Sequence, residues 1–126
     1  MKGFALSALL ILPLSVSAAG LACSIRPAEN TPVSALPGLA KISKAEAQKK
    51  ALARVKSPSA QIVSAELEIE QRCLVYSFDI RLPGKPGVEE VMVDAGTGKI
   101  VSHKHETAAQ EAAERAKDKA TSKKSR

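Results

Sequence analysis

Two histidines at alternate positions are the residues best suited to metal chemistry in this sequence. His103 and His105 flank Lys104, and residues two apart in a β-strand point to the same face. Their imidazoles are then expected about 7 Å apart, given a rise of about 3.3 Å per residue. A zinc site needs three or four protein ligands. The pair, with nearby Glu106, therefore indicates either weak capture of copper, nickel or zinc or two incidental surface histidines.

Nucleophilic catalysis has less support from the sequence. A nucleophile needs a base and an orienting group, and the chain has no other histidines to act as the base. Ser102 is next to His103, but neighbours in a strand point to opposite faces, so they do not form a catalytic dyad. We therefore expect no enzymatic activity and no cofactor.

Cys23 and Cys73 are the only cysteines, and they allow two kinds of covalent chemistry. In an oxidising compartment they can form a disulfide. Closing the loop between residues 23 and 73 in this way stabilises a small domain by about 4 kcal/mol. Alternatively, Gly20-Leu21-Ala22-Cys23 resembles a bacterial lipobox, in which the cysteine is acylated, although Gly20 stands where leucine is usual. Two unpaired thiols, or a disulfide between two molecules, would also fit the sequence. The intact mass of the mature protein distinguishes these forms.

Charged residues are grouped at two places in the chain. Glu66, Glu68 and Glu70 recur with the period of a strand, and they form either a solvated face or an acidic surface that binds a partner or attracts a metal. Residues 115–126 hold six Lys or Arg against one Asp, within a chain of net charge +6. Because no aromatic residue is interleaved with these charges, nucleic acid is not an expected partner. We expect a solubilising tail or attraction to anionic membrane surfaces.

Residues 1–19 have the features of an export signal. Lys2 precedes an apolar run from Phe4 to Leu14, and small residues follow. Cleavage is expected after residue 19, or between residues 22 and 23 if Cys23 is lipidated. The apolar run is shorter than the roughly 20 residues of a membrane-spanning helix. We therefore expect a periplasmic or secreted protein, with a lipid-anchored form as the alternative.

The composition divides the remainder of the chain into three parts. Proline and small polar residues dominate residues 20–40, which predicts a linker. If Cys23 pairs with Cys73, this linker must fold back over the domain. Residues 107–126 are rich in Ala, Lys and Glu and predict a marginal, solvated helix that frays into a disordered tail. Between them, residues 41–106 form the predicted folded domain.

One helix is predicted at the start of this domain. Ser43 and Glu46 have the spacing of a capping box, and the helix is expected to stop before Pro58 because the residue before a proline avoids the helical region. The buried side of the helix is expected to consist of Ala45, Leu52 and Val55, with Ile42 just before the cap and Ala51 at the border.

Four strands are predicted after the helix. Apolar and polar residues alternate over residues 62–70 and 72–82, two strands joined by a tight antiparallel connection. The apolar face of the first strand is expected to consist of Val63, Ala65, Leu67 and Ile69. Strands 88–94 and 99–105 follow a loop rich in proline and glycine. The helix and strands together predict an α+β fold, with one helix packed on a four-stranded antiparallel sheet.

The connection between the last two strands carries the most specific pattern, Val-Asp-Ala-Gly-Thr-Gly-Lys-Ile-Val at residues 93–101. Asp94 closes the first of these strands, and Gly96 and Gly98 are expected at positions where φ is positive. Together with the helix start and the two preceding strands, this pattern resembles the PepSY domain, an exported module also found in propeptides of thermolysin-type metallopeptidases. The resemblance covers residues 41–106.

The resemblance implies a module that binds and restrains peptidases, or that senses and regulates at the cell envelope, without catalytic residues of its own. We therefore expect a non-enzymatic binding module whose partner is an envelope protein or peptidase, contacted through the edges of the sheet. One alternative is a metal-responsive envelope protein that uses His103 and His105. A second is a lipid-tethered accessory protein.

Overall fold

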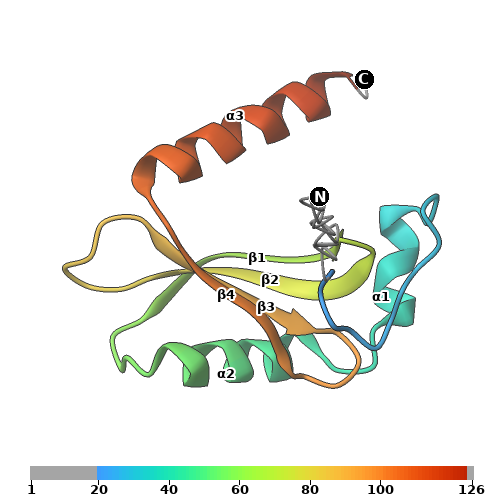
Figure 1. The fold of residues 1–126 in the computed structure, drawn as a ribbon, viewed down its shortest axis with the longest axis horizontal. Helices are drawn as coiled ribbons and strands as arrows, with labels where there is room; N and C mark the ends of the chain where they lie inside the picture. Colours follow the sequence, from blue (N-terminus) through green and yellow to red (C-terminus); the bar gives the residue numbers. More distant parts are fainter. Residues whose placement is uncertain (1–19, 125–126) are drawn as a thin grey trace, which may run out of the picture.

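The structure, a computed structural model, describes residues 20–124, and the predicted export signal at residues 1–19 lies outside them. Four strands form one antiparallel sheet in the order β1-β2-β3-β4. The strands are Gln61–Glu70 (β1), Cys73–Arg81 (β2), Val88–Asp94 (β3) and Ile100–Glu106 (β4). Helix α2, Lys44–Val55, lies under one face of the sheet, and helix α3, Ala108–Lys124, lies over the other (Figure 1). The predicted α+β fold is confirmed.

The main hydrophobic core lies between α2 and the sheet. The strands contribute apolar side chains that are completely buried, namely Leu74, Phe78, Ile80, Val91 and Val93. Ala47 and Ala51 of α2 are buried against them, whereas Ala45, which we expected on this face, is exposed. Because protein interiors are close-packed, two alanines on the inner side of the helix bring its backbone close to the sheet.

Helix α2 begins where the sequence predicts. Ser43 Oγ accepts a hydrogen bond from Glu46 N at 3.1 Å, and Glu46 Oε2 accepts one from Ser43 N at 2.9 Å, so both halves of the capping box are present. The Tyr76 hydroxyl donates to the carbonyl oxygen of Ile42 at 2.9 Å. The start of the helix is therefore tied to the middle of β2.

Strand β1 departs from the predicted alternation at one residue. A β-bulge between Ile62 and Ser64 inserts an extra residue into the pairing with β2. Ile62 packs against the core, while Val63 turns outward and is 45% exposed. The placement of Val63 on the buried face was therefore wrong, because a bulge shifts the alternation of side chains. Ala65, Leu67 and Ile69 pack against the core as predicted.

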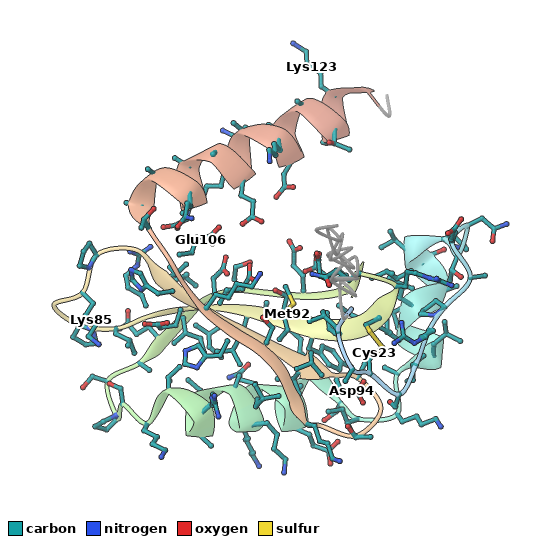
Figure 2. All side chains as sticks on the ribbon, in the orientation of Figure 1. Cys23, Lys85, Met92, Asp94, Glu106 and Lys123 are labelled. Carbon is teal, nitrogen blue, oxygen red and sulfur yellow. A yellow bond between two sulfur atoms is a disulfide. The ribbon has the colours of Figure 1, made fainter. Side chains whose placement is uncertain are left out.

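An N-terminal arm, residues 20–42, folds back over the domain, as pairing of the cysteines requires. Cys23 and Cys73 form a disulfide whose Cα atoms are 5.7 Å apart, and Figure 2 shows Cys23 beside the sheet. Both cysteines belong to a small second core with Val75 and Met92, on the face of the sheet opposite to α2. A thioether-linked lipid on Cys23 would need the sulfur atom that forms this bond, so a lipidated form would lack the disulfide.

The rest of the arm is held by a buried leucine and by backbone hydrogen bonds. A 3-10 turn, Val33–Ala35, leads into the short helix α1, Leu36–Leu39. Leu36 is buried within the main core, and the carbonyl oxygen of Ala95 accepts hydrogen bonds from Lys41 N and Ile42 N. The stretch predicted as a linker therefore packs as part of the folded unit.

Asp94 is a buried carboxylate that joins the arm to the hairpin between β3 and β4 (Figure 2). It is 1% exposed. Ser24 donates to it from N at 2.9 Å and from Oγ at 2.6 Å, and Thr97 donates from N at 2.7 Å and from Oγ1 at 2.8 Å. Burial alone would raise the pKa of Asp94, but the hydrogen bonds from Ser24 and Thr97 outweigh burial and lower the pKa to about 2.

The two glycines of this hairpin have different roles. Gly98 has a φ of 76°, as predicted for a residue without a Cβ atom. Gly96 does not have a positive φ, so that expectation was wrong. A Cβ atom at Gly96 would instead lie 2.1 Å from Ser24 Oγ, and Gly96 N donates a further hydrogen bond to Asp94 at 3.2 Å. Gly96 is therefore required for the close approach of the arm.

Helix α3 starts with a reciprocal cap. Thr107 N donates to Gln110 Oε1 at 2.9 Å, and Gln110 N donates to Thr107 Oγ1 at 3.2 Å. Glu111 forms an i,i+4 ion pair with Arg115, and the helix continues to Lys124. Good helix formers and a capped first turn account for this length.

Replacing Asp94 tests the importance of its hydrogen bonds. We expect Asp94→Asn to lower the free energy of unfolding at pH 7 by about 3 kcal/mol, because a neutral amide cannot satisfy the donors of Ser24, Gly96 and Thr97. Urea denaturation measures the change, and Asp118→Asn, at an exposed position of α3, is the matched control with little expected effect.

The difference in unfolding free energy between the unchanged protein and Asp94→Asn should also depend on pH, which provides a second test. The folded pKa of Asp94 lies below the unfolded value of 3.8, so its contribution to stability is present above that pH and is lost as the pH falls through about 2. Stabilities of the native protein and Asp94→Asn should therefore converge toward pH 2. Equal urea midpoints at pH 7 would contradict the role assigned to Asp94.

Candidate functional site

The two histidines flank a carboxylate that the sequence analysis did not include. Glu89 of β3 lies opposite His105 in the register, and its oxygens are 3.2 Å from His103 Nε2 and 3.4 Å from His105 Nδ1. Arg54 of α2 donates from Nε to His103 Nδ1 at 3.3 Å. His103 Nδ1 is therefore an acceptor, and Nε2 carries the proton that points to Glu89. The histidines are thus held in a polar cluster with Glu89 and Arg54.

Glu106, the third ligand suggested for the histidines, lies on the other face of the sheet. It is next to His105 in β4, and neighbouring side chains in a strand alternate. One oxygen of Glu106 lies within 4.8 Å of a carboxylate oxygen of Asp79 and of Glu90, the one such trio of potential metal ligands within residues 20–124. Glu106 Oε2 is buried without a hydrogen-bond partner. Strand register brings this trio together, and the spacing of the three residues along the chain gave no sign of it.

An acidic cleft of about 540 Å³ separates the sheet from α3. Figure 2 shows Glu106 at the foot of α3, where the helix leaves the sheet. The carboxylates that line the cleft come from the strands and from the helix, and they are Glu66, Glu68, Glu70, Asp79, Glu90, Glu111, Glu114 and Asp118. The cationic lining residues are Lys104 and Arg115. The predicted row of glutamates in β1 therefore faces a cleft with excess negative charge.

Burial and mutual repulsion raise the pKa values of several carboxyl groups in the cleft and of Glu106 beside it. Burial, followed by repulsion from the neighbouring glutamates of β1, raises the pKa of Glu68 to about 7. Burial and the carboxyl group of Glu114 raise the pKa of Glu106 to about 7. Burial is also the main reason that the pKa values of Asp79 and Glu90 are raised, with Glu114 adding to both. Part of the cleft therefore holds protons near neutral pH.

A second hollow, which we call the β1 groove, has a volume of about 620 Å³. It lies along β1 between that strand and the N-terminal arm. The lining residues are Thr31, Val33 and Leu36 of the arm and Glu66, Leu67, Glu68 and Ile69 of β1. Val33 is 77% exposed. The linker-like composition of residues 20–40 gave no sign of this groove.

The comparisons with known proteins identify the central part of the chain. A family model described as "Peptidase propeptide and YPEB domain", or PepSY, matches residues 41–104. No curated protein and no solved structure gives a significant match. The matched range begins just before α2 and ends within β4. Most of the arm, with Cys23 and Ser24, lies outside the matched range, and so does α3.

The raised pKa values of Glu68 and Glu106 make the free energy of unfolding depend on pH. The folded pKa values of Glu68 and Glu106 lie above the unfolded value of 4.5, so the folded protein binds protons that the unfolded chain releases between about pH 4.5 and pH 7. Their contribution to stability is complete below pH 4.5 and is lost as the pH rises through about 7. We expect Glu68→Gln combined with Glu106→Gln to reduce the loss of stability between pH 5 and pH 8, measured by urea denaturation.

The exposed Glu29, outside the acidic cleft, provides the control. Glu29→Gln should lose as much stability between pH 5 and pH 8 as the unchanged protein. A double variant that also loses the same amount would show that Glu68 and Glu106 do not hold protons in the folded state.

Proposed function

Because the chain belongs to the PepSY family of peptidase propeptide and YPEB domains, we propose that it is a non-enzymatic binding module that regulates an envelope peptidase or another envelope protein. The family match carries this proposal. It spans helix α2 and nearly the whole sheet. The acidic cleft, between the sheet and α3, and the β1 groove, between β1 and the arm, are two hollows beside this unit that can receive a partner.

The proposed location is the periplasm or the medium outside the cell. The disulfide between Cys23 and Cys73 supports an oxidising compartment. Among residues 20–124, no helix has both the length and the apolar character needed to cross a membrane. In a membrane-tethered form, Cys23 would carry a lipid in place of the disulfide, and the basic residues of 115–126 would add attraction to anionic headgroups.

Binding and inhibition assays test the proposed function. We expect the exported protein, purified with its disulfide intact, to form a stoichiometric complex with an envelope peptidase or envelope protein and to change the rate at which the peptidase cleaves a peptide substrate. The assay compares a panel of envelope peptidases with and without the protein, and a small exported disulfide protein of similar charge is the control. If no peptidase changes its rate and no envelope protein forms a complex, the proposal is wrong.

Weak binding of copper, nickel or zinc at His103 and His105 is a second candidate function. The observation that favours it is the carboxylate of Glu89, which has one oxygen 3.2 Å from His103 Nε2 and the other 3.4 Å from His105 Nδ1. The three side chains do not bring one ligand atom each within 4.8 Å of one another, so the binding is expected to be weak. Titration calorimetry with zinc and copper should give heat that disappears when His103→Ala and His105→Ala are combined. Equal heat from the double variant would exclude this site.

A further inference from the structure

Strand β1 forms an edge of the sheet, and its outer side has no partner strand. The sheet order places β1 beside β2 alone, and the pairing of the two is regular from Ser64 to Glu70. Within residues 20–124, no backbone hydrogen bond joins this stretch to any segment other than β2. An edge strand presents unpaired N–H and C=O groups along its outer side. This stretch of β1 is therefore a template for another extended chain.

The two faces beside this edge differ in chemistry. On the α3 side, alternate residues of β1 line the acidic cleft, namely Glu66, Glu68 and Glu70. On the α2 side, Leu67 and Ile69 line the β1 groove together with Val33 and Leu36 of the arm. Val33 is an exposed apolar side chain of this groove. A chain that pairs with β1 would therefore meet negative charge on one face and apolar surface on the other.

We propose that the outer edge of β1 binds an extended segment of a partner protein in which apolar residues alternate with lysine or arginine. The inference rests on the proposed function, since it names the surface and the class of segment that the binding module takes. Successive side chains of an added strand point to opposite faces of the sheet. The apolar side chains enter the β1 groove and the basic ones lie beside the glutamates, while backbone hydrogen bonds to β1 hold the segment in place.

Charge argues against a second copy of β1 as the occupant. If the β1 strands of two molecules paired, glutamates of one strand would lie opposite or diagonal to glutamates of the other, and like charges across a strand pair are destabilising. Burial and the adjacent glutamates already raise the pKa of Glu68 to about 7, so further negative charge beside Glu68 would be unfavourable. A lysine or arginine from the partner relieves the repulsion.

Two peptides of equal composition test the inference. One has about ten residues that alternate between lysine and valine, and the other has the lysines in one block and the valines in a second block. We expect the oxidised, exported protein to bind the alternating peptide at least about tenfold more tightly, with amide shifts in NMR spectra centred on residues 64–70. Equal affinities, or shifts confined to β4 or α3, would overturn the inference.

Two variants at exposed positions of the arm test whether the β1 groove itself contacts the peptide. Val33→Asp puts a charge into the apolar side of the groove at an exposed position, and it should weaken binding of the alternating peptide about tenfold. Leu39→Asp is the matched control, because Leu39 is an exposed residue of the same arm that does not line the groove. Equal affinities of the two variants for this peptide would contradict the inference.

Charge reversal tests the acidic face. The variant that combines Glu66→Lys with Glu68→Lys should no longer bind the alternating lysine-valine peptide. It should bind an alternating glutamate-valine peptide instead. If the variant keeps the preference of the unchanged protein, the glutamates do not select the segment, and the inference fails.

The same variants distinguish this inference from the proposed function. If Val33→Asp binds the envelope partner as tightly as the unchanged protein does, the proposed function stands and the β1 edge is not its binding surface. If no envelope partner is found but the alternating peptide is selected as described, the edge is a peptide-binding site and the regulatory role is wrong.

Discussion

The buried carboxylate of Asp94 is the constraint on which most of this structure depends. It lies at the end of β3 and receives hydrogen bonds from Ser24 of the arm and from Gly96 and Thr97 of the hairpin. A buried carboxylate without such donors is strongly destabilising, so the hairpin and the arm must take up their positions together. Ser24 directly follows Cys23, and the contact therefore also places the sulfur that bonds to β2. One ionised side chain thus links the turn, the disulfide and the arm.

The position of the arm decides which surfaces of the sheet stay open. Near the disulfide, Leu21 and Cys23 pack over Val75 and Met92, which covers one end of the face opposite to α2. Farther along the arm, Val33 and Leu36 form a wall of the β1 groove. The matched PepSY range, residues 41–104, does not include these parts. The family unit therefore supplies a helix and a sheet, and the flanking arm adds one wall of the β1 groove.

The two long helices are held to the sheet by different forces. Helix α2 buries alanines against a continuous apolar face, and such burial involves no titrating group. Helix α3 faces carboxylates across the acidic cleft and is connected to the sheet through the ion pair of Arg81 with Glu111, at 3.4 Å. Exposed ion pairs contribute at most about 1 kcal/mol. Helix α3 therefore lies over carboxyl groups with raised pKa values, among them Asp79 and Glu90, whereas α2 packs on an apolar face.

Elements whose signals lie within a few residues of one another could be predicted from the sequence. The capping box of Ser43 and Glu46, the strand alternation and the turn closed by Asp94 all depend on local spacing, and all are present in the structure. The outward turn of Val63 was not predictable, because a bulge depends on how two strands pair. Three further features depend on the same long-range pairing of segments. Gly96 leaves room for Ser24, and Glu106 lies beside Asp79 and Glu90. The arm lines one side of the β1 groove. These contacts join segments up to 70 positions apart, and periodicity along the chain carries no information about which distant segments meet.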